Sequence, residues 1–239
     1  MFNWNLDNCT YYEKNLIFPI YVFDEHNMAL AVWGTYRVKE NKPLHLITFD
    51  YHTDTRPPFN QALSNNYYQA EFGAKALKIP YVRSLLANIK YKANDFKFQD
   101  VYKISDFIKN DEQIQTAYTF QYLNSYHVIH RSNEASGFQK EDRLNNLNAT
   151  YINANDFSSK NITSIEAPIA LDFDLDFFTS RKELSQEFFT SIKYLIKNAA
   201  VITIAREPKY FNTCKTEKDF TNQEAEDLLI SGLLNILNE

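Results

Sequence analysis

Glycine is scarce in this sequence, with only 4 among 239 residues. No G-x-G-x-x-G or G-x-x-x-x-G-K pattern occurs, which excludes the usual glycine-rich loops that bind nucleotide phosphates. Cysteine is scarcer still, because Cys9 and Cys214 are the only two and cannot build a disulfide framework. We expect both to be reduced thiols in a cytoplasmic protein. Neither cysteine follows or precedes a histidine, and no C-x-x-C or H-E-x-x-H motif occurs, so no nucleophile triad is expected.

Basic residues are also in the minority, with 25 Lys and Arg against 30 Asp and Glu and a formal net charge of −5. This balance argues against a nucleic-acid partner, which would require a basic surface. No apolar run approaches the ~18 residues that span a membrane. Residues 1–8 have neither the basic nor the apolar part of a signal peptide. We therefore expect a cytoplasmic protein with no membrane partner.

Aromatic residues, in contrast, are abundant, with 16 Tyr, 19 Phe and an aromatic fraction of 15%. Such side chains bury large areas and often line pockets. No internal repeat or Pro/Gly/Ser-rich linker divides the chain, so residues 1–239 are expected to form one domain. Short apolar runs alternate with segments of helical periodicity, which predicts an α/β domain whose mainly parallel sheet is covered by helices.

This alternation predicts the following elements. Strands are expected at 17–23, 44–49, 126–130, within 167–178 and at 201–205. Helices are expected at 27–39, 61–90, 114–123, 185–198 and 221–237. We expect residues 132–148 to form a polar loop. Thr221, with Glu224 three positions later, is typical of a capping box at the start of the last helix.

An acidic segment with a histidine follows an apolar strand and reads Asp50-Tyr51-His52-Thr53-Asp54. Side chains two positions apart on an extended chain point the same way. Asp50, His52 and Asp54 are therefore expected to converge beyond the carboxyl end of the strand, where open α/β sheets place their ligand sites. Two carboxylates and an imidazole suit Mn²⁺, Fe²⁺ or Zn²⁺. A solvated turn is the alternative interpretation, and this segment alone does not decide between the two.

Three further carboxylates, those of Asp172, Asp174 and Asp176, alternate with apolar side chains at the end of another apolar run. Like charges so close together raise one another's pKa or recruit a cation. Buried carboxylates are rarely left without a partner or a metal ion. Because the intervening residues are apolar, we favour a metal site over an exposed strand end neutralised by Lys or Arg.

Together these segments resemble the arginase (ureohydrolase) family. That family carries Gly-Gly-Asp-His-Ser, then Asp-Ala-His-x-Asp about two dozen residues later, and much later Ser-Phe-Asp-Val-Asp. This chain has Phe23-Asp24-Glu25-His26-Asn27, then the segment that begins at Asp50, 24 positions after His26, and then Asp172-Phe173-Asp174-Leu175-Asp176. A lone histidine is more often structural than a ligand, so His26 becomes a candidate only with the two acidic segments. The resemblance implies a three-layer α/β/α fold with a mainly parallel sheet, as in arginases and deacetylases.

Carried over to this chain, the resemblance implies a centre of two divalent ions with six ligands. These are His26, Asp50, His52, Asp54, Asp174 and Asp176. Asp172 falls where the family has serine and is expected to support the ligands from behind. A shift of the register by two positions would instead make Asp172 a ligand in place of Asp176. By resemblance we expect the ions to be Mn²⁺, with other divalent metals as alternatives.

A smaller branch of the family, which includes peptide arginases, matches more closely. Its members show Asp/Glu-His-Asn/His-x-Ala-Leu-x-x-Trp and Leu-Asp-Ile-Asp-Leu-Asp-Phe-Phe. This chain has Glu25-His26-Asn27-Met28-Ala29-Leu30-Ala31-Val32-Trp33, and Leu171 to Phe178 matches the second stretch almost letter for letter. Such enzymes hydrolyse arginine side chains in a ribosomally made precursor peptide, giving ornithine and urea. The resemblance, which spans residues 17–210 with gaps, implies an arginine-containing peptide as the partner.

The implied chemistry suggests further roles. Two metal ions lower the pKa of a water, which attacks the guanidinium carbon, and Asp54 bridges the ions or accepts a hydrogen bond from the nucleophile. His130 or His127 is the candidate proton donor to the leaving amine, although a structural role is more common for each. Glu207, with Glu25 second, is the candidate carboxylate for the planar guanidinium. An ion pair with a neighbouring basic residue is the alternative for Glu207.

One departure from the family concerns the substrate. The family's free-arginine enzymes have a loop with Asn, Ser and His that grips the α-amino and α-carboxyl groups. Here the corresponding loop reads Thr55-Arg56-Pro57-Pro58-Phe59-Asn60, which favours a peptide substrate. The alternatives are a small-molecule amidinohydrolase or a deacetylase on the same fold, a non-catalytic metal-containing protein that binds a peptide, and a carboxylate-rich structural domain without metal. The oligomeric state stays open.

Overall fold

The central element of the protein is a seven-stranded sheet. The computed structural model describes residues 9–12, 19–56, 58, 108–132, 148–158, 165 and 168–239. Within these residues the strand order is β1-β2-β7-β6-β3-β4-β5. The strands are β1 (Cys9–Tyr12), β2 (Ile20–Phe23), β3 (Leu44–Asp50), β4 (Leu123–His130), β5 (Ala149–Asn153), β6 (Ile169–Asp174) and β7 (Ala199–Ala205). All neighbours are parallel except the edge strand β1, which runs antiparallel to β2.

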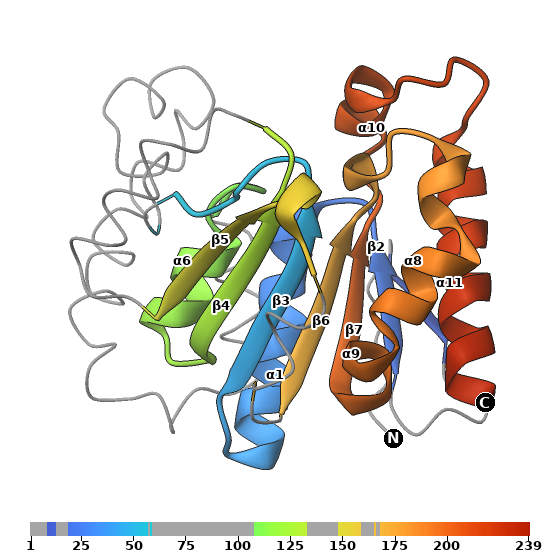
Figure 1. The fold of residues 1–239 in the computed structure, drawn as a ribbon. Helices are drawn as coiled ribbons and strands as arrows, with labels where there is room; N and C mark the ends of the chain where they lie inside the picture. The colour runs from blue at the N-terminus through green and yellow to red at the C-terminus, as the bar shows by residue number, and fades with distance from the viewer. Residues whose placement is uncertain are drawn as a thin grey trace, which may run out of the picture.

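Helices cover both faces of this sheet, as Figure 1 shows. One core cluster joins α1 and α6 to β3 and β4, and a second joins α8, α9 and α11 to β3, β6 and β7. The helices are α1 (Ala29–Glu40), α6 (Gln113–Thr119), α8 (Gln186–Ser191), α9 (Lys193–Asn198), α10 (Pro208–Cys214) and α11 (Asn222–Asn238). The predicted α/β architecture with a mainly parallel sheet is therefore confirmed. Of the helices that the structure describes, none is long and apolar enough to cross a bilayer.

The central strands are buried on both faces, which explains their nearly continuous apolar sequences. All six residues of β6 are buried. The Phe173 ring of β6 stacks on Phe49 of β3, with ring centroids 5.3 Å apart. The aspartates that alternate with these aromatic residues are consequently held inside the protein and away from bulk solvent.

Several predicted boundaries are wrong for identifiable reasons. The helix predicted at 114–123 ends at Thr119, because the chain turns at Gln121 with a φ of 59° and β4 begins at Leu123. The helix predicted at 185–198 is two helices, α8 and α9, divided at Ile192 (φ −105°, ψ 10°). The strand β5 and the helix α10 were not predicted.

Other predictions agree with the structure or lie outside it. Thr221 caps α11, because its side chain accepts a hydrogen bond of 3.1 Å from the backbone N–H of Glu224. The predicted strands at 44–49, 126–130 and 201–205 correspond to β3, β4 and β7. The helix predicted at 61–90 and most of the loop predicted at 132–148 lie outside the described residues.

Candidate metal centre

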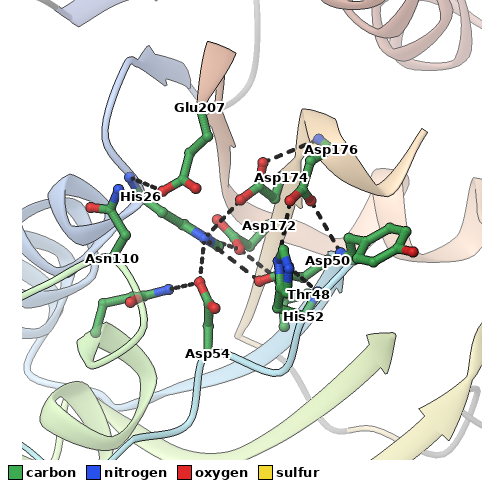
Figure 2. A network of polar contacts seen from close by, with 12 residues as sticks. His26, Thr48, Asp50, His52, Asp54, Asn110, Asp172, Asp174, Asp176 and Glu207 are labelled. Carbon is green, nitrogen blue, oxygen red and sulfur yellow. Dashed lines mark hydrogen bonds and ion pairs between the residues drawn. The ribbon is translucent and has the colours of Figure 1, made fainter. Parts of the chain in front are cut away.

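The carboxyl ends of neighbouring parallel strands bring acidic side chains to one edge of the sheet. Phe49 of β3 pairs in register with Phe173 of β6, so Asp50 and Asp174 follow at adjacent strand ends. The 3-10 turn Leu175–Phe177 carries Asp176 back over this edge. Figure 2 shows these carboxylates pointing toward one another, with His26 entering from the end of β2 and Glu207 from the end of β7.

A first group of potential ligands surrounds His26, whose side chain is fully buried. Its Nδ1 atom lies 3.0 Å from Asp54 Oδ2, 3.4 Å from Asp174 Oδ2 and 3.7 Å from Asp50 Oδ2. The potential ligand atoms of these four residues all lie within 4.8 Å of one another. They form the His26 group, which consists of one imidazole nitrogen and three carboxylate oxygens.

Asp172 determines which His26 nitrogen faces this group. It accepts hydrogen bonds from Thr48 Oγ1 (2.7 Å) and Thr203 Oγ1 (2.5 Å), and its Oδ2 lies 2.8 Å from His26 Nε2. A carboxylate only accepts, so the proton is on Nε2, and Nδ1 presents either a lone pair or a second proton to three carboxylates. A lone pair facing three carboxylates is stabilised by a proton or a metal ion between them. Metal-ligating histidines commonly donate their other N–H to a carboxylate in this way.

A second group of potential ligands consists of His52, Asp176 and Cys214, whose ligand atoms also lie within 4.8 Å of one another. His52 Nδ1 lies 3.2 Å from Asp176 Oδ2, and Cys214 Sγ lies 3.9 Å from the same oxygen. The other oxygen of Asp176 accepts a hydrogen bond of 3.2 Å from the backbone N–H of Tyr51. One carboxylate oxygen of Asp176 is thereby fixed and the other is directed into the group, which we call the His52 group.

Asp50 connects the two groups. Its Oδ2 faces His26, as described above, while its Oδ1 lies 3.9 Å from His52 Nδ1 and accepts the backbone N–H of His52 at 2.7 Å. The Oδ2 atom is buried and has no hydrogen-bond partner among the described residues. An unsatisfied buried carboxylate oxygen is costly unless a cation neutralises it. The residues therefore fit two divalent ions, with Asp50 between them.

The raised pKa values of the acidic residues in the cluster reflect the same excess of negative charge. Burial, together with neighbouring carboxylates, raises the pKa of Glu207 to about 10 and that of Asp174 to about 7. The same causes raise the pKa of Asp50 well above its ordinary value. Burial alone would lower the pKa of His26, but its contacts with Asp172 and other carboxylates raise it well above 6.5. Without another cation the cluster holds protons, and divalent ions would meet the same electrostatic need.

Two residues at this edge have unusual backbone conformations. Asp54 has a φ of 47° and Glu207 a φ of 36°, values that non-glycine residues rarely adopt. Asp54 Oδ2 accepts a hydrogen bond of 3.0 Å from Gln113 Nε2, in addition to its contact with His26. Glu207 Oε1 accepts a hydrogen bond of 3.3 Å from the backbone N–H of His26. Such strain is typical of functional sites, where the surrounding structure holds side chains in place.

The structure separates some predicted site residues. Asp50, His52 and Asp54 were expected to converge on one point, but the chain bends after β3. The structure places His52 in the second group and Asp54 in the first, with Asp50 in contact with both. His127 contacts His45, with 2.9 Å between Nδ1 and Nε2, inside the sheet and before the strand end. His130 does end β4, in register with Asp50.

The candidates for guanidinium binding also differ in position. Glu207 is buried at 6% exposure and points into the cluster (Figure 2), whereas Glu25 accepts a hydrogen bond of 2.6 Å from Asn110 in an exposed contact. Among the described residues, the neighbouring Arg206 forms ion pairs with Glu226 and Asp24.

Three residues at the site were not foreseen from the sequence. Gln113 at the start of α6 supports Asp54, Cys214 completes the His52 group, and the Tyr210 ring lies 6.0 Å from the His52 ring. Cys214 and Tyr210 belong to α10, which contacts the 3-10 turn that carries Asp176. No short motif marks these residues. They reach the strand ends through two long-range contacts, that of α6 with Asp54 and that of α10 with the turn Leu175–Phe177.

The sheet order and the helices on both faces define an α/β fold with a mainly parallel sheet. Among solved structures, the chain is similar to the formimidoylglutamase from Bacillus subtilis subsp. subtilis str. 168, with a TM-score of 0.55 and 11% sequence identity. The alignment covers 90% of this chain and 60% of that protein. No protein-family model and no curated protein matches the sequence. At this identity the likeness establishes the fold, and the chain spans 60% of the length of the formimidoylglutamase.

Proposed function

We propose that the protein is a dinuclear-metal hydrolase that acts on guanidino groups. In its specific form, the proposal is that it converts arginine side chains of a ribosomally made precursor peptide to ornithine and releases urea. The observation that carries the proposal is the pair of ligand groups joined by Asp50, with the buried Glu207 directed at them. The fold agrees with this proposal, because the arginase-like sheet places both groups at its carboxyl edge.

The His26 group and the His52 group would each hold one divalent ion, for which we propose Mn²⁺. Asp174 is held in place for this role, because its Oδ2 faces His26 and its Oδ1 accepts the backbone N–H of Asp176 at 3.2 Å. Such a pair of ions lowers the pKa of a water and polarises the substrate. The protein's own contribution is to fix the ligands and to keep bulk solvent away from them.

Glu207 is the proposed partner of the substrate guanidinium. A carboxylate binds this planar cation through two parallel hydrogen bonds, and both are strongest away from bulk water. The pKa of Glu207, raised to about 10 by burial and by neighbouring carboxylates, means that it is protonated while the cluster lacks cations. Metal ions bound at the site would lower this pKa and favour the ionised form. Glu207 would then be negatively charged when the cationic guanidinium binds.

His130 is the proposed proton carrier. Its Nδ1 lies 3.0 Å from the carbonyl oxygen of Ser132, which places a proton on Nδ1, so that the neutral ring carries none on Nε2. Burial lowers its pKa, so the ring is neutral near pH 7. A neutral imidazole accepts a proton from the attacking water and returns it to the leaving amine.

The choice of a peptide substrate rests on the surroundings of the His52 group. Tyr210 is 44% exposed beside His52 and offers an aromatic contact to a chain that crosses the site. The second candidate is a small-molecule amidine substrate, which the similarity to a formimidoylglutamase favours. The two substrates need different binding groups. A small amino acid derivative needs charged side chains that bind its own amino and carboxyl groups, whereas an arginine within a peptide has neither group free.

The test is urea release by the Mn²⁺-reconstituted protein with an arginine-containing peptide, free arginine and agmatine side by side. Formamide release from N-formimidoyl-glutamate is measured in parallel, and Asp174→Ala is the inactive control. Urea from the peptide alone, lost in the variant, is the expected result. Equal turnover of free arginine would refute the peptide preference. No product from any guanidino or formimidoyl substrate, with two ions bound, would direct attention to deacetylation or to peptide binding without catalysis.

A further inference from the structure

The two ligand groups differ in their chemistry. The His26 group presents one nitrogen and three carboxylate oxygens, whereas the His52 group contains a sulfur atom, Cys214 Sγ. Carboxylate oxygens suit Mn²⁺ and Mg²⁺, while thiolates favour Zn²⁺, Fe²⁺ and other softer ions. A cysteine is therefore not a neutral addition to a manganese site, because it changes which ion the site prefers.

Cys214 reaches the group through α10. This helix begins at Pro208, immediately after Glu207, and its last residue is Cys214. The helix contacts the 3-10 turn that contains Asp176, and Figure 1 shows it beyond the carboxyl edge of the sheet. The thiol is half-buried, and its contact within the described residues is with the Asp176 oxygen that faces His52.

The separations in the His52 group match those of ligands around one ion. In a tetrahedral site with metal–sulfur bonds of ~2.3 Å and metal–nitrogen or metal–oxygen bonds of ~2.1 Å, sulfur and oxygen lie about 3.6 Å apart and nitrogen and oxygen about 3.4 Å apart. The corresponding distances here are 3.9 Å for Cys214 Sγ to Asp176 Oδ2 and 3.2 Å for His52 Nδ1 to Asp176 Oδ2. Only small side-chain shifts separate this arrangement from a coordinated one.

A second observation concerns the neighbouring carboxylate. Asp50 is fully buried, and its Oδ1 lies 3.9 Å from His52 Nδ1. Its Oδ2, which faces His26, has no hydrogen-bond partner in the described part of the chain and so points, independently of the thiol, to a cation in the adjoining His26 group. With Asp50 the His52 group offers four ligand residues, which is the number that a tetrahedral ion requires.

We propose that Cys214 is a thiolate ligand of the ion in the His52 group, so that the two ions of the centre are held by unlike ligand sets and the His52 group prefers Zn²⁺, Fe²⁺ or Co²⁺ over Mn²⁺. The proposal rests on the two-ion centre of the proposed function and replaces Mn²⁺ by a softer ion at one of its two positions. Formation of the sulfur–metal bond releases the thiol proton to solvent. A purely structural thiol, in contrast, would keep its proton and remain a weak donor to Asp176.

Cobalt(II) titration of the metal-free protein tests the proposal directly, because a cobalt–thiolate bond gives a charge-transfer absorption that oxygen and nitrogen ligands do not. Wild type, Cys214→Ser and Cys9→Ser are compared, with bound cobalt counted by elemental analysis. Cys9 lies in the edge strand β1, separated from β6 by β2 and β7, and is the matched control. We expect the band in wild type and Cys9→Ser and its loss in Cys214→Ser. Zn²⁺ affinity should fall more than about tenfold in that variant, since loss of an outer partner alone costs that much.

Two bound cobalt ions without the band, or a band that survives in Cys214→Ser, would overturn the proposal while leaving the proposed function intact. Binding of no cobalt at all would overturn both. Alkylation of the wild-type protein by iodoacetamide, mapped to each cysteine by mass spectrometry, does not depend on the folding of any variant. Zn²⁺ is expected to protect Cys214 and Mn²⁺ to protect it much less, and equal alkylation with and without Zn²⁺ would refute thiolate coordination.

Discussion

The stability of the metal-free protein is expected to depend strongly on pH, because several groups of the carboxylate cluster have shifted pKa values. Asp174 has its pKa raised from 3.8 to about 7, first by burial and then by Asp176. The unfolded chain loses this proton near pH 4 and the folded chain near pH 7, so the folded state is destabilised progressively as the pH rises between these values. The hydrogen bond to Asp176 raises the pKa of His52 to about 9. Its stabilisation is present below pH 6.5 and is lost as the pH rises through 9.

These two effects have the same sign, and Glu207, whose pKa is raised from 4.5 to about 10, adds to them. His45, whose pKa is lowered to about 4, opposes them between pH 4 and 6.5. The sum is an expected loss of stability of the metal-free protein from pH 5 to pH 8. Between pH 5 and 7 the raised pKa of Asp174 alone corresponds to a loss on the order of 3 kcal/mol, at 1.36 kcal/mol per pH unit. Divalent ions reverse the trend, because they bind the deprotonated ligands and their affinity rises with pH. At a free concentration of 100 times the dissociation constant, each ion adds about 2.7 kcal/mol of stability.

The assay is urea denaturation at pH 5, 6.5 and 8, with a chelator and with saturating Mn²⁺. The expected result is a free energy of unfolding that falls with pH in chelator, together with an increment from Mn²⁺ that grows with pH. A metal-free protein that is more stable at pH 8 than at pH 5 would refute the reasoning, and so would a metal increment that is equal at both pH values.

Three further predictions concern single residues. Asp172→Asn should weaken the tighter-bound ion by about 10- to 100-fold in chelator competition, because it removes the negative partner that orients the buried histidine. Unchanged affinity would contradict this role. Glu207→Gln should retain two ions but lower kcat/KM for the guanidino substrate by about 10- to 150-fold, the equivalent of one charged hydrogen bond. Loss of an ion would instead make it a ligand. Gly232→Ala should reduce the free energy of unfolding by about 1–3 kcal/mol, because its Cβ would lie 2.1 Å from the buried Phe189 ring; Ser231→Ala, on the exposed side of the same helix, is the neutral control.

Much of the fold was predictable because the signals were local. The apolar runs of β3, β6 and β7 are long enough to be recognised as strands, and the capping residue Thr221 marks the start of α11. The carboxyl edge of a parallel sheet is also the place where polar residues after each strand must meet. The positions of Asp50 and Asp174 at strand ends therefore follow from the sequence, whereas the pairing of β3 with β6 comes from the structure.

The division of the ligands into two groups was not predictable in the same way. It depends on the bend after β3, which directs His52 and Asp54 to different groups, and on the left-handed conformation of Asp54. Neither the bend nor the left-handed residue is marked in the sequence by a glycine or proline at that position. Cys214 reaches the site only because α10 folds back over the turn that carries Asp176, a contact between segments that no local pattern specifies.

The proposed roles of His127, His130 and Asp172 are still predictions, but the three side chains lie in different surroundings. His127 is engaged with His45 within the sheet, whereas His130 ends β4 beside Asp50 in the register. Position in the strand separates the two histidines, because the strand predicted at 126–130 ends at His130, as β4 does. The Asp172 side chain, held by two threonines and His26, occupies the supporting position expected from the resemblance.

The central claim is that two divalent ions bind between these strand ends. Anomalous diffraction from crystals grown with Mn²⁺, recorded on both sides of the manganese absorption edge, tests it most directly. Two peaks are expected, one among His26, Asp50, Asp54 and Asp174 and one beside His52 and Asp176. No peak at this edge of the sheet, with saturating Mn²⁺ in the crystal, would rule out a metal centre here.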